Sequence, residues 1–409
     1  MNVLNTLPFQ PLSAGLSLLQ GVSVLDLTTS VAGPYCTQLL ADLGAEVTKV
    51  EKRITGDDTR AWGPPFLDGE SLWFLSVNRN KTSITIDLLR PEGRKVLQEL
   101  VKASDVVVLN TSAVVQKKLG VDYETLSALN RSIIHVSITG FGLQGPRAEL
   151  PCYDLIAEGY AGIMDLTGEA SGPPQKVGTP ASDLLAGQDA AMATLAALYE
   201  RQRTGTGKQI DVSMVASSVR FMAPKMVPYL GSGDLQRRSA GRDSVIAIYQ
   251  VFDTADEPIT LGLGNDAIWR RFWAAVGRPE YGEQSGLESN AKRRNARERI
   301  VATIADILAG RTRADWLSLF EQHRIPAGPI NTIEQLAADP IFQEEGLFFA
   351  IQGPEGLIPQ VGLGIRFDGQ SHAVRNPPPA LGQDSERILS ERLSMSSSCI
   401  AGLVDSEII

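Results

Sequence analysis

The chain has 409 residues, of which 43% are hydrophobic and 21% are charged, and its formal net charge is −9. This length suffices for two substantial domains, and the negative balance argues against nucleic acid as the main partner, because phosphate contacts dominate such interfaces. The three cysteines lack metal-ligand spacing, and neither a signal-peptide pattern nor a membrane-length apolar run is evident, so we expect a cytoplasmic protein without metal or membrane.

The first segments alternate between strand and helix. Residues 22–27 and 46–51 are short runs rich in β-formers, which predicts two strands. Between them, Gly33 and the following proline open a helix over 36–43, which Gly44 ends. Strand, helix and strand within about thirty residues predict a βαβ unit.

The same alternation continues downstream. Runs at 82–87, 105–110 and 133–138 predict further strands, and 91–102 predicts a helix with proline in its first turn. Repeated βα units predict an α/β fold in which helices cover both faces of a doubly wound parallel sheet.

A dinucleotide-binding oxidoreductase is one interpretation of this alternation. Residues 28–34, after the first strand, lack the spaced glycines that let a backbone approach a pyrophosphate. Glu51 stands where a ribose-binding acid would lie, but without those glycines it is better interpreted as a solvated strand end.

Asp154 is the main candidate for chemistry. It stands at the start of the helix-prone stretch 155–162, where free backbone N–H groups and the helix dipole stabilise a carboxylate. An ionised carboxylate in such a place can attack an acyl carbon. The alternative is that Asp154 serves only as the N-cap of its helix.

A change of pattern follows. The apolar stretch 183–203 predicts a helix that ends at Arg201, Arg203 and Gly205, and 245–263 alternates like a hairpin. We expect helices at about 266–277, 293–309 and 313–322, and a smaller domain from near residue 225 to near residue 330.

Several short segments, in order between about residues 20 and 385, together resemble the class III coenzyme A transferases, or CaiB/BaiF family. That family includes formyl-CoA:oxalate and carnitine CoA-transferases and, more distantly, α-methylacyl-CoA racemase. The matching segments are 32–34, 43–47, 56–60, 80–83, 153–154, 167–168, 204–208, 264–266 with Trp269, and 325–329.

The resemblance implies an architecture and a reaction. A Rossmann-like large domain would be built from both chain ends, 1–224 and 331–409, around a smaller α+β domain at 225–330, in an interlocked homodimer. Asp154 would match the nucleophile that forms an acyl anhydride and then an aspartyl-CoA thioester. Acyl-CoA and small organic acids would be the substrates, with no permanently bound cofactor.

Candidate CoA contacts come from the resemblance and from the sheet. The resemblance implies Lys81, and places Lys52 and Arg53 near the ADP moiety. Because ligands bind at the carboxyl ends of such strands, the fold independently favours Asn110, Thr139 and Gly140. Further candidates are Ala32, Lys117 and Lys118. For Lys52, Arg53, Lys117 and Lys118, a solvated charged face is the alternative.

Departures from the family concern the acyl pocket. The formyl-CoA:oxalate enzymes carry a histidine and a glutamine where this chain has Thr29, Ser30 and Val31, and a run of glycines that is missing here. These differences argue against oxalate, and leave Gly262 and Gly264 as candidates for a flap.

Arg60 is our candidate for docking a carboxylate of a succinate-like or hydroxydicarboxylic acceptor, because a guanidinium binds carboxylates bidentately. The alternative is that Arg60 pairs with Asp57 or Asp58, or that it contacts CoA.

A racemase and a catalytically silent CoA-binding protein are the alternatives to a CoA-transferase. A racemase of this family needs two bases and carries a histidine directly before the matching aspartate, where this chain has Cys152 and Tyr153. The only histidines are His135, His323 and His372, and His135 lies within an apolar predicted strand. A catalytically silent CoA-binding protein would have no need of Asp154.

Overall fold

The computed structural model describes residues 3–371 and 374–409, so His372 lies outside the described residues. The chain divides into two compact units. The large unit comprises 1–162, 177–223 and 339–409, and the small unit comprises 163–176 and 224–338. The segment 163–176, which the sequence analysis assigned to the large domain, therefore packs with the small unit, and that unit extends to 338 rather than 330.

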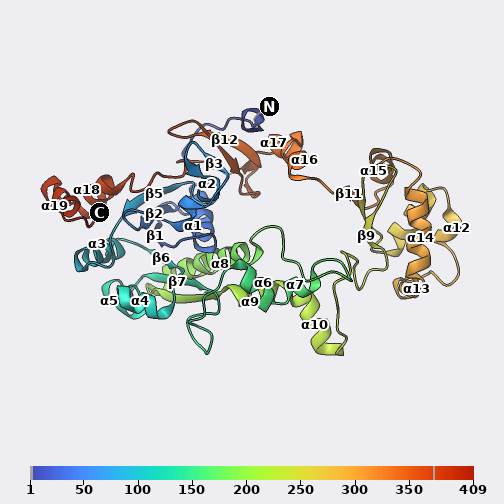
Figure 1. Cartoon of the computed structure of the whole chain (residues 1–409), viewed down its shortest axis with the longest axis horizontal. Helices are drawn as coiled ribbons and strands as arrows, with labels where there is room; N and C mark the ends of the chain where they lie inside the picture. Colours follow the sequence, from blue (N-terminus) through green and yellow to red (C-terminus); the bar gives the residue numbers. More distant parts are fainter. Residues whose placement is uncertain (1–2, 372–373) are drawn as a thin grey trace. The chain divides into compact units, whose positions relative to one another are not determined.

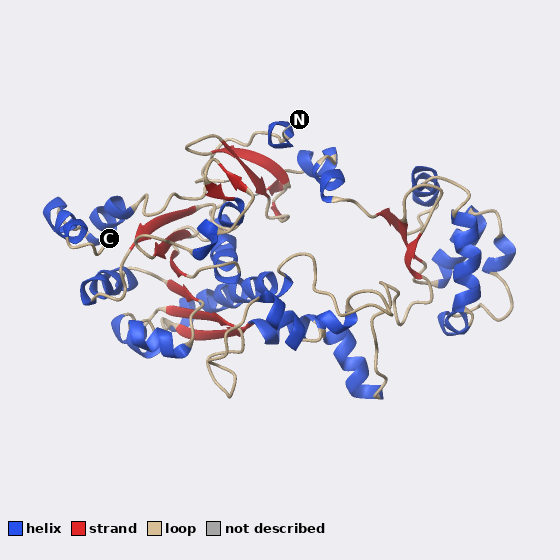
Figure 2. Cartoon of the chain, in the orientation of Figure 1, coloured by secondary structure: helices blue, strands red, loops and turns tan. Residues whose placement is uncertain are grey.

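The large unit is built on six parallel strands (red in Figure 2). In sheet order they are β5 (Lys81–Thr85), β2 (Glu46–Glu51), β1 (Ser23–Leu27), β6 (Val106–Leu109), β7 (Ile134–Thr139) and β8 (Lys208–Ser213). Renumbered among themselves they run 3-2-1-4-5-6, so the order reverses between β1 and β6. Ligands bind at that switch point in open α/β sheets.

Helices cover both faces of this sheet, as the alternation predicted (Figure 1). On one face lie α1 (Ala32–Asp42), α6 (Asp154–Tyr160), α8 (Ala181–Thr204) and α9 (Met214–Phe221). On the other lie α3 (Pro91–Lys102), α4 (Ala113–Leu119), α5 (Tyr123–Leu129), α18 (Ser385–Leu393) and α19 (Ser397–Asp405). The chain's C-terminal segment thus returns to the large unit.

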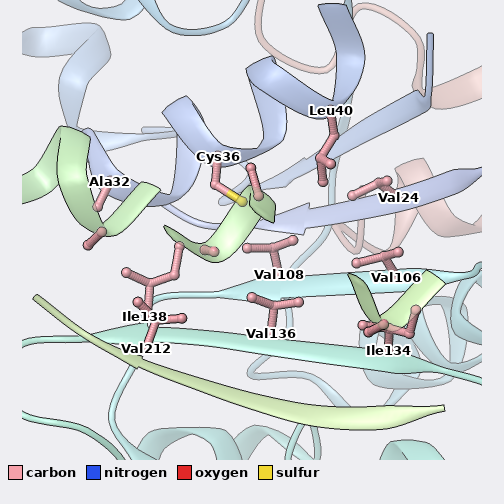
Figure 3. Close-up of a cluster of buried hydrophobic side chains, with 14 of the residues drawn as sticks. Val24, Ala32, Cys36, Leu40, Val106, Val108, Ile134, Val136, Ile138 and Val212 are labelled. Carbon is pink, nitrogen blue, oxygen red and sulfur yellow. The ribbon is translucent and has the colours of Figure 1, made fainter. Parts of the chain in front are cut away.

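The α1 face of the core is closely packed around small and branched side chains (Figure 3). Val24, Val106 and Val136 line the sheet beneath α1, and Cys36 reaches down from the helix. Helix α8 contributes a face of alanines and Gly187, where an added Cβ would lie 2.7 Å from the Ala32 carbonyl oxygen. The small residues therefore let α8 approach α1 closely, which positions the N-terminus of α8.

The remaining elements of the large unit are short. The helical ones are η1 (Val3–Thr6), η2 (Asp58–Ala61), α2 (Leu72–Ser76) and α17 (Pro340–Glu344). The others form three antiparallel pairs of short strands: β3 (Phe66–Leu67) with β4 (Glu70–Ser71), β12 (Phe348–Gln352) with β13 (Leu357–Val361), and β14 (Arg366–Phe367) with β15 (Gln370–Ser371). Phe74, Phe349 and Ile351 form a separate small core here.

The small unit has an antiparallel sheet of β9 (Tyr249–Phe252), β10 (Ile259–Gly262) and β11 (Ala327–Pro329), which confirms the predicted hairpin. Trp269, Phe272 and Trp316 lie in its core. Its helices are α7 (Ile163–Leu166), α11 (Asp266–Ala275), α12 (Pro279–Gly282), α13 (Asn290–Asn295), α14 (Arg297–Leu308), α15 (Arg313–Gln322) and α16 (Ile333–Ala337), while α10 (Ala223–Ser232) begins at the boundary. Across the described ranges, no helix combines the length and apolarity needed to cross a membrane.

Candidate functional site

A cavity of about 340 Å³ lies in the large unit at the carboxyl ends of β1, β6 and β7. Polar residues that directly follow or end these strands face it, and the fold places it at the switch point of the sheet. The lining residues are Thr29, Ser30, Ala32, Asp58, Asn110, Ser112, Ile138, Thr139, Gly140, Ala148, Glu149, Leu150, Pro151, Cys152, Tyr153, Asp183 and Met214.

Asp154 directly follows Tyr153 of the cavity wall and is the first residue of α6. Its Oδ1 accepts hydrogen bonds from the backbone N–H groups of Ser182, at 2.8 Å, and Asp183, at 3.3 Å. These groups belong to the first turn of the 24-residue α8, so the carboxylate faces the positive end of a second helix. Among the described residues, none forms a hydrogen bond with Oδ2.

The interpretation of Asp154 as only an N-cap is wrong in this structure. Tyr153 occupies the N-cap position of α6, and no side chain caps that helix. The carboxylate instead joins the start of α6 to the start of α8, with one oxygen anchored. This arrangement stabilises negative charge on Oδ1 and leaves Oδ2 available for chemistry.

Two further titratable groups lie beside Asp154. Burial, and next the charge of Asp154, raise the pKa of Asp183 to about 7. Burial, followed by Asp183 and Asp154, raises the pKa of the Cys152 thiol to about 11. The thiol therefore stays protonated at neutral pH and is a poor nucleophile, so Asp154 is the better candidate at this cavity.

The loop after β1 forms one wall, and Asn110 holds it. The Asn110 Oδ1 accepts from the Thr29 N–H at 3.1 Å, and its Nδ2 donates to the Thr29 carbonyl at 2.7 Å. Ser30 adopts the left-handed region with φ of 68°, and its N–H donates to Asp57 at 3.0 Å. Val31 is only 3% exposed and is the N-cap residue of α1, so the structure does not place it on the cavity surface.

The close packing at the end of β7 requires a glycine at position 140. A Cβ on Gly140 would lie 2.1 Å from the Cys152 Cβ, so only glycine lets the strand end pass the segment before Asp154. Thr139 and Gly140 both line the cavity, where they were expected. The Thr139 hydroxyl accepts from the Gly142 N–H at 2.9 Å, which fixes the turn that follows.

A buried ionic network lies behind the β1 loop. Lys81 donates to Asp26 at 3.0 Å, and Lys49 lies 2.9 Å from Asp57. All four side chains are fully buried. Burial alone would raise the pKa of Asp26, but Lys49 and Lys81 hold it well below its ordinary value. Lys49 also donates to the Thr28 carbonyl at 2.8 Å, so the network supports the cavity loop from behind.

The prediction that Lys81 contacts CoA does not fit its environment and is corrected here. Its ammonium donates to Asp26, to the Pro34 carbonyl and to Asn78, at 3.0, 2.8 and 2.8 Å. These three bonds use all three donors of a lysine, and none remains for a phosphate. Lys81 is therefore part of the scaffold.

The prediction that Arg60 docks a substrate carboxylate is corrected for a similar reason. Its Nε and Nη2 bind Glu51 bidentately at 2.8 Å each, and Nη2 also donates to the Pro379 carbonyl at 3.1 Å. The guanidinium lies 3.7 Å from the centre of the Phe74 ring, and the side chain is 10% exposed. Its bidentate partner is Glu51 rather than Asp57 or Asp58, and Glu70 lies 3.8 Å from Nη1. The other alternative, a contact with CoA, is not tested.

The other predicted basic residues remain accessible. Lys52 pairs with Asp58 of the cavity wall at 3.0 Å, on the exposed surface. Arg53 pairs with Glu407 at 2.9 Å. Lys117 and Lys118 are exposed in the last turn of α4, and no residue in the described ranges forms a hydrogen bond or ion pair with their side-chain ammonium groups. Since α4 follows the cavity residue Ser112, these two lysines are candidates for a phosphate.

The flap candidates belong to the small unit. Gly262 ends β10 and lines a separate cavity of about 430 Å³, together with Tyr249 and Gly328. Gly264 follows it, with no heavy atom within 4 Å of the place of a Cβ. Both lie in the small unit, and their role as a flap stays a prediction.

The two described histidines do not support acid–base catalysis by histidine at this cavity. His135 is fully buried in β7, and its Nε2 is 2.9 Å from the Val121 carbonyl oxygen. Its burial lowers its pKa. His323 ends α15 in the small unit. Neither of these two described histidines lines the cavity, which weakens the racemase interpretation.

Sequence reasoning missed Asp183 as part of the site. The residue was expected only as the start of a helix, and an acidic residue in a first turn is so common that it carries no signal. Its proximity to Asp154 depends on how α8 packs against α1 and α6, which the local sequence does not reveal.

Comparison with known proteins finds similarity to CoA-transferases and to a CAIB/BAIF family protein. The family model of CoA-transferase family III matches residues 19–385. Succinyl-CoA:glutarate CoA-transferase of Homo sapiens is 35% identical over 393 residues, covering 96% of this chain and 90% of that protein. Succinate–glutarate CoA-transferase of Agrobacterium fabrum is 37% identical over 380 residues, covering 91% and 95%. A crystal structure of a CAIB/BAIF family protein from Brucella suis aligns with a TM-score of 0.81 at 36% identity, covering 92% of this chain and 100% of that one.

Proposed function

This chain belongs to CoA-transferase family III, and we propose that it moves CoA from an acyl-CoA thioester to a free dicarboxylic acid through covalent intermediates on Asp154. The human relative is named for succinyl-CoA and glutarate, and the Agrobacterium relative for succinate and glutarate. Succinate and glutarate are dicarboxylic acids, and succinyl-CoA is the CoA thioester of succinate. A hydroxydicarboxylic acid is a further candidate acceptor, since a Chloroflexus relative is named for citramalate.

The observation that carries this proposal is the asymmetric environment of the Asp154 carboxylate. The oxygen Oδ2 is free to attack the acyl carbon of the donor, which would give a mixed anhydride and release CoA. The CoA sulfur would then attack Cγ of Asp154 and release the donor acid. The acceptor acid would repeat both steps in reverse.

The anchored oxygen has a second role in this scheme. When sulfur attacks Cγ, negative charge develops on Oδ1 in the tetrahedral intermediate. The N–H groups of Ser182 and Asp183 already point at that atom, at 2.8 and 3.3 Å. Two preorganised backbone donors at a helix N-terminus are the usual means of stabilising an oxyanion, and we assign them that function.

We propose that the CoA tail lies at the cavity rim. We propose that Lys52, Arg53, Lys117 and Lys118 bind its phosphates, because they are basic groups of the large unit outside the buried network. The wall formed by Ala32, Thr139 and Gly140 would contact the pantetheine arm near the reacting thioester. No permanently bound cofactor is needed for this chemistry.

We propose a homodimer as the working form. Large apolar side chains stand exposed on α6, α8 and α9, which is unusual for a monomer. They are Tyr153, Leu155, Ile156, Tyr160, Met192, Tyr199, Val219 and Phe221, each at least 41% exposed. If the two chains interlock, dimer and fold are lost in one transition, and light scattering across a dilution series tests this. A folded monomer at low concentration would contradict interlocking. The cysteine content favours a cytoplasmic location.

The direct test is a CoA exchange assay with succinyl-CoA as donor and glutarate as acceptor. We expect Asp154→Asn to fold and to bind CoA with unchanged affinity, but to lose turnover, because an amide cannot form the anhydride. Tyr153→Phe is the matched control, since it alters the adjacent residue without removing a carboxylate. An asparagine variant free of wild-type enzyme that still exchanged CoA would exclude the proposal.

A further inference from the structure

A second carboxylic acid, Asp183, stands beside Asp154 and has no part in the reaction so far. It is the third residue of α8 and lines the cavity. Its backbone N–H donates to Asp154 Oδ1, but its own carboxyl forms no hydrogen bond or ion pair within 3–371 or 374–409. A partly buried carboxyl without a protein partner, on a cavity wall, is available to a group inside the cavity.

The charged groups around Asp183 favour its protonated form. Asp154 faces it from α6, Cys152 from the preceding segment, and Asp58 lines the same cavity. Helix α9 packs against α8 and brings Arg220, but this arginine pairs with Asp189 further along α8. On α1, the nearby titratable group is Tyr35, whose ring lies against Gly187.

Within the part of the chain that the structure describes, no cation forms an ion pair with either aspartate. Burial, and next the charge of Asp154, raise the pKa of Asp183 from its ordinary 3.8 to about 7. Near neutral pH this carboxyl carries its proton in a large fraction of molecules, while a free thiol titrates near ~8.5. Transfer of the proton from Asp183 to a thiolate is therefore favourable, and its return is not prohibitively costly.

We propose that Asp183 is the acid–base residue that gives a proton to the departing CoA sulfur and takes it back in the following step. This inference rests on the proposed function.

In the first step, Oδ2 of Asp154 forms a bond to the acyl carbon and the carbon–sulfur bond breaks. The sulfur keeps the bonding electron pair and takes the proton of Asp183, which becomes a carboxylate. In the second step, the Asp183 carboxylate removes that proton as sulfur attacks Cγ of Asp154. The Cγ–Oδ2 bond to the acyl group breaks, and the donor acid leaves as a carboxylate. No proton is exchanged with solvent.

The charge of Asp154 controls when Asp183 gives up its proton. Asp154 carries its negative charge before the attack, and this charge strengthens the hold of Asp183 on its proton. Once Asp154 is acylated, that charge is gone, so the pKa of Asp183 falls just as the sulfur departs. The acid becomes stronger at the moment when its proton is needed.

The test compares wild type, Asp183→Asn and the control Asp189→Asn, an aspartate on the same helix that pairs with Arg220 outside the cavity. Release of succinate, which accompanies formation of the aspartyl-CoA thioester, is measured in a single turnover of succinyl-CoA between pH 5.5 and 9. We expect the wild-type rate to fall as pH rises above about 7, since the active form is protonated. Asp183→Asn should be at least ~100-fold slower and lack that fall, while Asp189→Asn should follow wild type.

A second readout does not depend on activity. Infrared difference spectra should show the carbonyl band of a protonated carboxyl that disappears through about pH 7 in wild type and in Asp189→Asn, and is missing in Asp183→Asn. If wild type exchanges no CoA, the proposed function fails, but this band still reports on Asp183. Should Asp183→Asn fail to fold, Asp183→Ser replaces it in both measurements. A wild-type rate and pH profile in the variant, or a carboxyl that titrates near its ordinary 3.8, would overturn the inference.

Discussion

Replacing Lys81 by methionine separates a scaffold role from a CoA-binding role. Methionine keeps the aliphatic volume but removes the ammonium, which donates to Asp26 and Asn78 in a fully buried setting. Asp26 would keep Lys49 only at 3.9 Å, together with the Thr28 and Thr37 hydroxyls. The variant thus holds a buried carboxylate that has lost its nearest cation.

The expected loss follows from these contacts. The orphaned Asn78 oxygen costs about 1–3 kcal/mol, and removing one partner of a buried ion pair costs about 3–5 kcal/mol in total. We therefore expect the free energy of unfolding, measured by urea denaturation with circular dichroism, to fall by about 3–5 kcal/mol. The KM for acyl-CoA of the folded fraction should change little.

Lys52→Met is the matched control and should show the opposite pattern. Its ion pair with Asp58 joins side chains that are 61% and 55% exposed, so stability should change by less than about 1 kcal/mol. Its KM for acyl-CoA should rise if it contacts a phosphate. A Lys81→Met enzyme of wild-type stability with a raised KM would refute the scaffold assignment and restore the original prediction.

Three further predictions concern other parts of the large unit. Arg60→Lys should lower the free energy of unfolding by about 1–3 kcal/mol, because it breaks the bidentate contact with Glu51. The change in steady-state activity should be equal for mono- and dicarboxylate acceptors. A selective loss of activity with dicarboxylates would return Arg60 to the substrate site. Lys117→Ala combined with Lys118→Ala should raise the KM for acyl-CoA and reduce its salt dependence with little change in kcat, and an unchanged KM at low salt would exclude these lysines from the CoA site. Gly187→Val should lower the melting temperature, because an added Cβ meets a carbonyl oxygen of α1 at 2.7 Å, and an unchanged melting temperature would argue against this close packing.

Most strands of the sheet could be predicted, because short local patterns in the sequence identify them. The run 46–51 and the helix 91–102 were placed at their observed bounds, since a short run rich in β-formers and helix-start signals suffice there. The edge strand β8 was missed, because its residues are largely exposed and mostly polar, and resemble a loop.

The site was harder because partners come from distant segments. Lys81 and Arg60 look like surface residues in the sequence, and only the folded chain shows that Asp26 and Glu51 bind them. Likewise, Asp154 was predicted from its helix start, but its anchoring by α8 was not. Tertiary contacts, rather than local propensity, decide whether a charged side chain serves the scaffold or the ligand.

The most direct measurement of the central proposal follows oxygen atoms. Enzyme loaded with CoA from succinyl-CoA is allowed one turnover with glutarate whose carboxyl groups carry ¹⁸O, and the peptide containing Asp154 is examined by mass spectrometry. If the acceptor attacks an aspartyl thioester, one labelled oxygen must remain on Asp154 when the new thioester leaves. We predict that label on this peptide, and none on it in Asp154→Asn. Formation of glutaryl-CoA without label in Asp154 would contradict the covalent mechanism.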